Sequence, residues 1–518
     1  MDTILVLDCG GQTCQLIARR IRELGVYTEV APSDIPLQGD AVDGVKGIVV
    51  SGSPFSVHDQ GAPQTDSRLL DVGVPVLGIC YGMQHVMHRA GGRVSANHVS
   101  EYGRSAVTQA GTSPLFATLP RSFVSWMSHG DAVEEVAVGF DISARSEHQS
   151  VAAVESSSAN SAPFYGLQFH PEVTHTENGV DILRNFAVDI CGASSEWSVA
   201  QMQEQAVEEI RAQVGARPVV LMFSGGVDSA VVAALLLAAL PAEQVHLLYV
   251  DTGLMRAGET DEVRRTLAAM GATNVRIVAA EARFLDALAG VEEPERKRQI
   301  IGDLFIEVQA QEIGNEVADA FLAQGTLYTD LIESGRGVGN KADIIKSHHN
   351  VASPMVAAKR DAGLLVEPLA HLYKDEVRRL GRSLGVPEQV VGRHPFPGPG
   401  LGVRILGEVT RERCDLLRAA DAIYMEELHS RGLYDRITQA FAVLLPVRSV
   451  GVTGDSRSYG SVVALRAVQT ADFMTADVYP FDIRELVEIG SRITNEVAAV
   501  GRVVYDVSSK PPATVEWE

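Results

Sequence analysis

The stretch VVLMFSGGVDSAVVAALLLAAL, residues 219–240, decides the fold of the middle of the chain. Its first five residues are apolar and predict a buried strand, and the unbroken apolar run from Ala230 to Leu240 predicts a buried helix. Between them lies SGGVDS, residues 224–229, whose two glycines permit a tight turn. Such a turn is typical of a parallel α/β sheet, and it points several backbone N–H groups at one place.

These N–H groups, together with the positive end of the helix dipole, predict a phosphate site at the loop. A phosphate loop of the form GxxxxGK[ST] would supply a lysine to the β- and γ-phosphates. Here the only ionisable side chain of the loop is the Asp228 carboxylate, which favours a magnesium-bound pyrophosphate over transfer of the γ-phosphoryl group. The alternative is a plain glycine-rich turn in which Asp228 caps the helix.

The full string SGGVDS in this context resembles the loop of the ATP pyrophosphatase family, whose members cleave ATP between the α- and β-phosphates and transfer AMP. The resemblance implies that the loop holds the departing pyrophosphate and that Asp228 binds Mg²⁺ brought in with ATP. The ATP-binding residues that it implies are Ser224, Gly225, Gly226, Val227, Asp228, Ser229 and Ala230.

Asp251, in the string YVDTG, ends the predicted strand that follows this loop in the sequence. The carboxyl end of a parallel strand is the usual place for a nucleotide contact, so Asp251 is a further candidate for ATP binding. Capping of a turn by Asp251 is an equally good explanation.

Predicted strands and helices alternate on both sides of this stretch. The strands expected before the polar interval CGASSEWS (191–198) lie at 4–7, 47–52, 74–80 and 165–170, with helices at 15–24 and 84–90. Strands at 219–223, 245–251, 275–280 and 364–369 follow. The string HPFPGPGLG (394–402), with three prolines and three glycines, excludes regular structure. Beyond it we expect helices at 412–428 and 484–497 and strands at 447–453, 461–468 and 502–508.

The chain is therefore predicted to be α/β, with two consecutive parallel-sheet α/β domains at residues 1–194 and 195–393. A smaller α+β domain is expected to follow at residues 394–518. For the middle domain, the resemblance implies an ATP pyrophosphatase fold similar to that of the adenine-nucleotide alpha hydrolases.

Composition restricts the partners and the compartment. A net charge of −22 argues against nucleic acid and against an anionic membrane surface. The N-terminus has neither a basic segment nor a long apolar one, and the longest apolar run is shorter than the ~20 residues that a membrane span needs. Five scattered cysteines, an odd number, indicate reduced thiols and a cytoplasmic location.

A second kind of chemistry is predicted in the first domain. PVLGICYGMQ (75–84) places Cys80 between a buried strand and a helix, with glycines two residues away on either side. The N-terminus of the helix favours the thiolate, so Cys80 is a candidate nucleophile. GLQFHPEVTHT (166–176) places His170 at the end of another strand and Glu172 two residues later, which completes a Cys–His–Glu arrangement. Taken alone, Cys80 would more often be a structural cysteine, and His170 an ordinary core or surface histidine.

Together, GxCxGxQ and FHPE resemble the class I glutamine amidotransferases, which release ammonia from glutamine through a glutamyl thioester. The resemblance covers about the first third of the chain. It implies an oxyanion hole made by backbone N–H groups at Tyr81 and in the loop SGSPFSV (51–57), where Ser53 replaces a glycine usual in the family. If this position requires a positive φ, Ser53 adds strain of about 1 kcal/mol.

An ammonia source joined to an adenylating domain describes a glutamine-dependent amide or amine synthetase. The strings QGTLYTDLIESG (324–335), IKSHHNV (345–351), EPLAHLYKDEVRRLG (367–381), HPFPGPGLGVRILG (394–407) and KPPATVEWE (510–518) resemble the glutamine-hydrolysing GMP synthetases over essentially the full length. The resemblance implies XMP, ATP and glutamine as substrates and a homodimer. It assigns XMP contacts to Arg404, Lys510 and Glu516, and a lid over the nucleotides to Lys346, His348 and His349.

One departure from the family pattern, one possible metal pair and two alternative functions stay open. The lid continues as HHNVASPM, with Ala352 and Ser353 where the family usually has two glycines. A zinc site at His348 and His349 would lack a third ligand at familiar spacing. A sister synthetase that acts on another carbonyl acceptor would have the same architecture. A regulatory nucleotide-binding protein without turnover is the alternative from another class.

Overall fold

The computed structural model describes residues 2–157, 162–313, 319–327, 330, 354–453, 456–470 and 475–518. Residues 2–201 form one compact unit, and residues 202–327 with 354–518 form another. We call them the first unit and the second unit. Over the described part of the chain, no helix is both long enough and apolar enough to cross a membrane.

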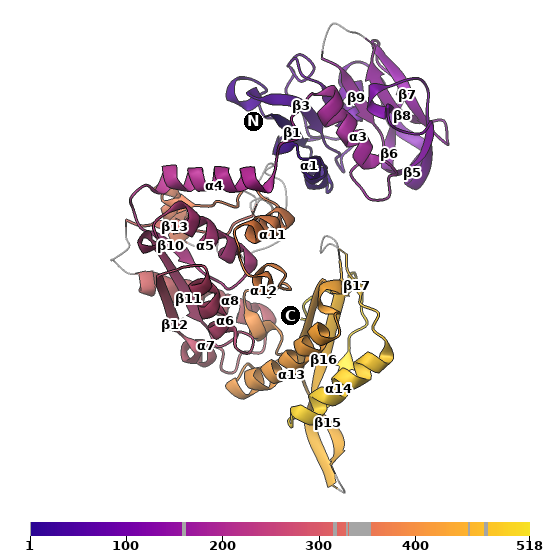
Figure 1. The fold of residues 1–518 in the computed structure, drawn as a ribbon. Coiled ribbons are helices and arrows are strands. Elements are labelled where there is room, and N and C mark those ends of the chain that lie inside the picture. Colours follow the sequence, from indigo (N-terminus) through magenta and orange to yellow (C-terminus); the bar gives the residue numbers. More distant parts are fainter. Residues whose placement is uncertain are drawn as a thin grey trace. The chain divides into compact units, whose positions relative to one another are not determined.

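The first unit is built on a nine-stranded sheet in the order β2-β1-β3-β4-β9-β8-β7-β5-β6 (Figure 1). Five of these strands are parallel: β2 (Tyr27–Pro32), β1 (Thr3–Asp8), β3 (Val45–Val50), β4 (Val76–Ile79) and β9 (Phe164–Leu167). The other four are antiparallel: β8 (Val151–Ser156), β7 (Phe140–Ser146), β5 (Arg93–Gln109) and β6 (Ser122–Glu135). The helices are α1 (Cys14–Glu23), α2 (Tyr81–Arg89) and α3 (Gly179–Arg184), with a π-helical segment at Asn185–Ile190 and 3₁₀ turns at Gly39–Val42 and Pro114–Phe116.

The parallel half confirms the α/β prediction, whereas the antiparallel half was not predicted. Strands β1, β3 and β4 carry continuous apolar runs because both faces of the parallel half are covered. Burial alternates along β6, as it does in a strand with one solvated face, and this weaker pattern was missed. The strand expected to reach His170 ends at Leu167, so His170 lies in the loop that follows β9.

The second unit begins with a five-stranded parallel sheet in the order β12-β11-β10-β13-β14. Its strands are β12 (Asn274–Ala279), β11 (Val245–Asp251), β10 (Val219–Met222), β13 (Phe321–Ala323) and β14 (Leu365–Val366). Its helices are α4 (Val199–Val214), α5 (Val227–Ala239), α6 (Glu259–Ala269), α7 (Glu281–Ala287), α8 (Pro294–Ile313), α10 (Pro354–Asp361), α11 (Lys374–Ser383) and α12 (Glu388–Val391), with a 3₁₀ turn at Ala242–Gln244. Helix α5 is buried on most sides, which explains why its sequence is apolar nearly throughout.

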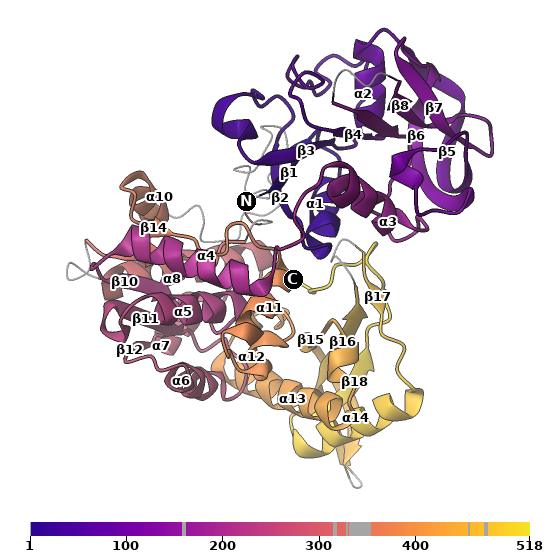
Figure 2. The same ribbon diagram turned by 45° about the horizontal axis from the view of Figure 1, so that its top comes forward.

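The rest of the second unit is α+β, as predicted (Figure 2). It contains α13 (Arg411–Ser430), β15 (Gln439–Thr453), β16 (Ser456–Gln469), β17 (Asp477–Val478), α14 (Ile483–Glu496) and β18 (Val500–Tyr505), with 3₁₀ turns at Gly400–Val403 and Tyr434–Arg436. Strand β16 pairs with the antiparallel β15 and β17 and with the parallel β18. The Pro-Gly string forms no helix or strand before the turn at Gly400, as expected.

Alternate residues of β15 face two different sets of partners. Ala440, Ala442 and Leu444 belong to a core that includes α13 and α14 and also reaches Val250 of β11. Phe441 and Val443, which point to the other face, pack with Val515 of the C-terminal segment. The segments predicted as second and third domains therefore share one hydrophobic core. Their boundary, like the other predicted boundary, stays a prediction.

One close approach holds the first unit together around the turn at Cys80. A Cβ added at Gly82 would lie 2.9 Å from the carbonyl carbon of Val50, and closer still to its oxygen, so that only glycine lets α2 lie against the end of β3. We expect Gly82→Ala to destabilise the first unit by about 1–3 kcal/mol, because either the helix or the strand has to move.

Urea denaturation followed by the fluorescence of Trp126, a residue of this unit, measures the effect of Gly82→Ala. Gly111→Ala is the matched control, because an added Cβ there meets none of the described atoms within 4 Å. Equal unfolding midpoints for the two variants would contradict the close packing of α2 on β3.

Candidate active sites

Cys80 lies at the turn between β4 and α2, as predicted. Its φ of 52° is positive, a conformation that among the described non-glycine residues only Gln149 and Asn178 share. Such a conformation is costly for a residue with a Cβ and is typical of functional turns. The backbone N–H of Cys80 donates to the Leu167 carbonyl at 2.6 Å, which ties the turn to the end of β9. The thiol is therefore fixed at the N-terminus of α2, where the helix dipole favours an anion.

His170 and Glu172 are brought together with Cys80. His170 Nδ1 lies 2.7 Å from Glu172 Oε1, and since a carboxylate accepts, Nδ1 carries the proton. A Cβ added at Gly52 would lie 3.3 Å from His170 Cε1 and 3.8 Å from Cys80 Cβ, so both residues border the same loop. Burial lowers the pKa of His170, but the Glu172 carboxylate and the contact with Cys80 outweigh it and raise the pKa to about 10. This arrangement can abstract the proton of a thiol and hold it.

The loop after β3 carries Ser53, the residue that departs from the family pattern. The φ of Ser53 is not positive, so the strain considered for this position does not arise. Ser53 Oγ instead accepts a hydrogen bond from the Phe55 backbone N–H at 3.3 Å. Tyr81 follows the nucleophile, and its hydroxyl donates to the Pro63 carbonyl at 2.6 Å. The oxyanion hole at Ser53 and Tyr81 stays a prediction.

Two glutamines beside Cys80 were quoted within the sequence motifs but received no role. Gln168 Nε2 donates to Cys80 Sγ at 3.6 Å, and its own carbonyl oxygen accepts from Gln84 Nε2 at 3.1 Å. Gln84 Nε2 also donates to the Asp131 carbonyl at 2.7 Å, and Cys80 Sγ lies 3.8 Å from the Ser128 carbonyl. Residues 128–131 of strand β6 therefore form part of this site, and nothing local in the sequence pointed to them.

The phosphate loop has the predicted form. Gly225 has a φ of +80°, which requires glycine, and Gly226 precedes the first residue of α5. Ser229 Oγ accepts from the Ser224 N–H at 3.2 Å and donates to the Gly226 carbonyl at 3.0 Å, which closes the loop on itself. The first turn of the helix consists of Val227, Asp228, Ser229 and Ala230. Helices leave N–H groups unpaired at this end, so the loop is built to bind an anion.

The loop has a lysine after all, supplied from another part of the sequence. Lys374, the first residue of α11, places Nζ 2.7 Å and 2.6 Å from the two carboxylate oxygens of Asp228. The string that contains Lys374 was recognised in the sequence, but no charge was assigned to the loop from it, because the two residues are 146 positions apart. Among the described residues no group of three or more metal-binding side chains occurs. The single carboxylate fits a Mg²⁺ held jointly by Asp228 and phosphate oxygens, which is usual for this ion.

Asp251 ends β11, at the predicted place. One oxygen of its carboxylate accepts from the Gly253 N–H at 3.0 Å, and the other accepts from Thr260 Oγ1 at 2.7 Å. These bonds are those of the turn-capping alternative. A nucleotide contact of Asp251 stays a prediction.

Arg404 and Glu516, two of the residues assigned to XMP, form a pair with each other. Arg404 is fully buried, and its Nη2 and Nε donate to the two oxygens of Glu516 at 2.8 Å and 3.1 Å. Gln439 Nε2 donates to the same carboxylate at 2.7 Å. The guanidinium carbon lies 4.1 Å from the ring centre of Phe441 and 4.9 Å from that of Phe396. The pair therefore holds the C-terminal segment in place with a geometry that few other side chains could reproduce.

The C-terminal segment is ordered along its length. Lys510 pairs through its backbone with Ala476, at 2.8 Å and 3.0 Å. The last residue, Glu518, lies 2.5 Å from Nζ of Lys297, a buried residue of α8, and its carbonyl accepts from Arg298. Neither Lys297 nor Arg298 was predicted, because both belong to a helix that shows no motif of its own.

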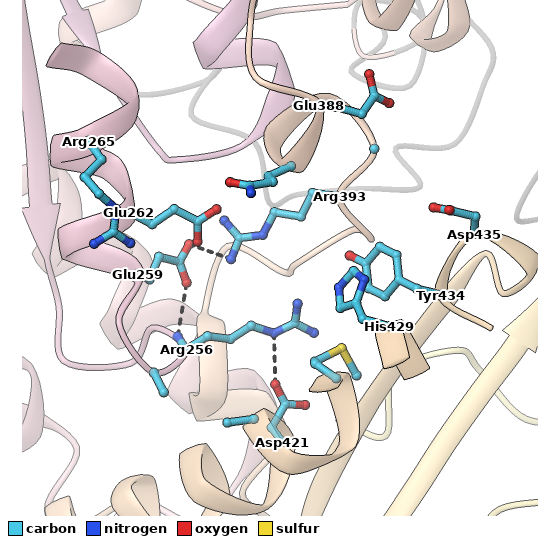
Figure 3. A pocket seen from close by; sticks show the side chains of 15 residues that line it. Arg256, Glu259, Glu262, Arg265, Glu388, Arg393, Asp421, His429, Tyr434 and Asp435 are labelled. Atoms are coloured by element: carbon cyan, nitrogen blue, oxygen red, sulfur yellow. Dashed lines mark hydrogen bonds and ion pairs between the residues drawn. The ribbon is translucent and has the colours of Figure 1, made fainter. Parts of the chain in front are cut away.

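A pocket of about 650 Å³ lies beside the phosphate loop, between α6, α12 and α13 (Figure 3). Arg393 Nη2 lies 2.9 Å from Glu259 Oε1, and Arg256 Nε lies 3.0 Å from Asp421 Oδ2. Arg393 also donates to the Gly225 carbonyl at 3.5 Å. These ion pairs connect the phosphate loop to α13, and none of the residues predicted for a site lines this pocket.

The predicted lid residues Lys346, His348 and His349 lie outside the described residues, as do Ala352 and Ser353.

Three family models match the chain. Those described as glutamine amidotransferase class-I, asparagine synthase and GMP synthase C-terminal domain match residues 5–190, 199–294 and 426–517. Fold, sites and family models together define the class: a class I glutamine amidotransferase joined in one chain to an ATP-using synthetase.

Curated relatives named as glutamine-hydrolyzing GMP synthases match over the whole length. The protein of Idiomarina loihiensis is 48% identical over 99% of this chain and 98% of its own, and that of Xylella fastidiosa (strain 9a5c) is 50% identical over 100% and 99%. The protein of Chlorobium chlorochromatii is 48% identical over all of both chains. The chain belongs to the family of glutamine-hydrolysing GMP synthases.

The charge of Glu172 accounts for the protonated state of His170. Glu172→Gln should lower the pKa of His170 from about 10, because burial then disfavours the imidazolium without the opposing carboxylate. A ¹⁵N NMR titration of the labelled histidines measures this. Glu177→Gln is the control. It changes a carboxylate of the same loop that accepts from the Val124 N–H, and it should leave the pKa of His170 unchanged.

The same pair makes the stability of the first unit depend on pH. The pKa of His170 in the folded chain lies above its unfolded value of about 6.5, so the stabilisation is complete below pH ~6.5 and is lost as the pH rises towards 10. This loss should shrink in Glu172→Gln, and an unchanged titration of His170 would show that Glu172 does not set its charge.

Proposed function

We propose that the protein aminates XMP to GMP, with ATP converted to AMP and pyrophosphate and with glutamine as the source of ammonia. The observation that carries the proposal is the presence in one chain of the Cys80 site and the SGGVDS loop, in a protein similar to GMP synthases over its full length. XMP is proposed as the acceptor because residues 426–517 match the family model described as GMP synthase C terminal domain.

In the glutaminase step, His170 already holds the proton of Cys80, and Cys80 Sγ attacks the carboxamide carbon of glutamine. His170 returns the proton to the leaving nitrogen, and ammonia departs. Water then hydrolyses the thioester to glutamate and restores the thiol. Glu172 holds the imidazole in position, since its carboxylate accepts from Nδ1 at 2.7 Å. The backbone N–H groups of Ser53 and Tyr81 would hold the oxyanion.

In the synthetase step, residues 224–230 bind the phosphates of ATP through backbone N–H groups. Asp228 would hold Mg²⁺, which neutralises phosphate charge when it is bound. Lys374 supplies a second positive charge at the same place, and its contact with Asp228 supports a role on the pyrophosphate side of the bond that breaks. A carbonyl oxygen of XMP attacks the α-phosphorus of ATP, and pyrophosphate leaves. Ammonia then attacks the carbon that bears this oxygen, AMP leaves, and loss of a proton from the nitrogen gives GMP.

The XMP site is proposed at Lys510 and Glu516, with Arg404 in support of Glu516. Because Arg404 is buried and gives both donors to Glu516, it would act by fixing the acceptor that faces the purine. Lys346, His348 and His349 would close over the bound nucleotides, and Asp251 would contact ATP. We also propose a homodimer formed through residues 394–518. A cytoplasmic location is supported by five cysteines that form no disulfide among the described residues.

Ammonia is the only intermediate that the two chemistries share. Cys80→Ala should therefore abolish GMP formation from glutamine and retain GMP formation from added ammonium at high pH. Conversion of XMP with each nitrogen source measures this, with Cys191→Ala, a cysteine of the same unit outside the turn, as the control. Loss of both activities in a folded Cys80→Ala protein would rule out two separate sites.

Asp228 is assigned to the chemistry of ATP. Asp228→Asn should reduce AMP formation by far more than tenfold and leave the fold intact, because its side chain is 30% exposed and its partner Lys374 is 44% exposed. XMP-dependent release of pyrophosphate is the measurement. Asp261→Asn, which changes an exposed carboxylate in the first turn of α6, is the control. An Asp228→Asn enzyme within tenfold of the wild type would refute the assignment.

A further inference from the structure

A buried pair of titratable residues lies behind the Cys80 site and has no role in the steps above. Glu101 of β5 and His129 of β6 are directly opposite each other across the antiparallel pair, and each side chain is only 2% exposed. Glu101 Oε2 and His129 Nε2 are 3.8 Å apart, which is too long for a hydrogen bond. Within the described part of the chain, neither atom has a hydrogen-bond partner.

The other contacts of the pair fix what these two atoms can do. His129 Nδ1 lies 2.9 Å from the Asp131 backbone carbonyl, and because a carbonyl only accepts, Nδ1 must carry a proton. In a neutral imidazole, Nε2 is then a bare acceptor. Glu101 Oε1 accepts from Ser146 Oγ at 2.7 Å, which leaves Oε2 as a second bare acceptor. Two buried acceptors that face each other are unfavourable, because each has lost its water and gained no donor.

One proton between the two atoms removes this conflict. We propose that Glu101 Oε2 and His129 Nε2 close from 3.8 Å to hydrogen-bond distance around a single proton, and that this proton-sharing pair positions residues 128–131 of β6 for glutamine hydrolysis at Cys80. The inference rests on the proposed amidotransferase function. It makes Glu101 and His129 positioning residues, which act through this part of β6 and not on the substrate.

Residues 128–131 of β6 connect the pair to the nucleophile by two routes. Ser128, next to His129, presents its carbonyl to Cys80 Sγ at 3.8 Å. The Asp131 carbonyl accepts from both His129 Nδ1 and Gln84 Nε2, and Gln84 in turn donates to Gln168 Oε1. Gln168 Nε2 completes the path by donating to Cys80 Sγ. A His129 ring that loses its orientation would therefore disturb both contacts of the sulfur.

The charged and titratable groups that face His129 are Glu101, Asp131 and His170. Burial lowers the pKa of His129, the Glu101 carboxylate opposes this, and a charged His170 adds to the lowering. Complete transfer of the proton to His129 is thus disfavoured while His170 is an imidazolium. A shared proton satisfies both acceptors without a second full positive charge at the site.

Two substitutions of Glu101 separate the proposal from simple packing. Glu101→Gln supplies a permanent donor to Nε2 and keeps an acceptor for Ser146, so glutaminase activity should stay within about threefold of the wild type. Glu101→Ala leaves Nε2 bare and should lower the glutaminase kcat by at least about tenfold. Loss of the shared proton, at a pH below that at which His170 ionises with its pKa of about 10, should lower the wild-type kcat, and this ionisation should be absent in Glu101→Gln. GMP synthesis from added ammonium should not change in either variant.

Glu155→Gln and Glu155→Ala are the matched controls, because Glu155 of β8 accepts from Ser113 Oγ at 2.5 Å in a similar Ser–Glu contact without a histidine. Both controls should retain the wild-type kcat and pH profile. Equal kcat values for Glu101→Ala and the wild type, or an ionisation below the pKa of His170 that persists in Glu101→Gln, would overturn the proposal.

¹⁵N NMR of the His129 ring gives a readout independent of activity. We expect Nδ1 to be protonated and Nε2 to be hydrogen-bonded in the wild type and in Glu101→Gln. A bare Nε2 in the wild type would overturn the proposal, and this comparison decides the matter even if Glu101→Ala does not fold. A wild-type protein that hydrolyses no glutamine would instead refute the proposed function, and the spectrum would still test the pair.

Discussion

The two candidate sites depend on one constraint: parallel strands in a sheet end at the same edge, and the backbone leaves unpaired N–H groups where a helix begins there. Cys80 follows β4 and the phosphate loop follows β10, each directly before a helix. His170 follows β9, the neighbour of β4, so the acid–base partner reaches the sulfur from the adjacent strand end. The same backbone geometry thus places the Cys80 turn in the first unit and the SGGVDS loop in the second, although the side chains differ completely.

Buried cationic side chains also hold the second unit together. Lys297, Arg404 and Arg466 are fully buried, and each forms an ion pair with a carboxylate. Arg404 and Lys297 meet Glu516 and Glu518, so a segment with few apolar residues is nevertheless fixed on the sheet. Removal of one partner destabilises the folded unit far more than the intact pair stabilises it, because the remaining charge stays buried without a partner. The C-terminal segment therefore belongs to the structure of the unit, where its position in the chain alone would suggest fraying.

The sequence predicted the features that are encoded within a few residues. The turn at Cys80, the His170–Glu172 spacing, the SGGVDS loop and helices such as α13 each have a local pattern, and each lies where it was expected. What was missed depends on residues far apart in the chain. Lys374 reaches Asp228, and Glu101 meets His129 across a register shift in β5. The assignment of Arg404 and Glu516 as separate contacts did not include their pairing, since nothing local shows that two residues 112 positions apart share a buried ion pair.

The core shared across the second unit also limits how the protein can be divided experimentally. A fragment that ended near residue 393 would keep Val250, Leu254 and Phe284 but lose Leu401, Ile405 and the residues of α13 that cover them. Such a fragment would expose a broad apolar face and would tend to aggregate. The first unit carries a core of its own, formed by residues from Leu5 to Phe164. For expression and crystallisation, residue 201 is accordingly a suitable fragment boundary, and residue 393 is not.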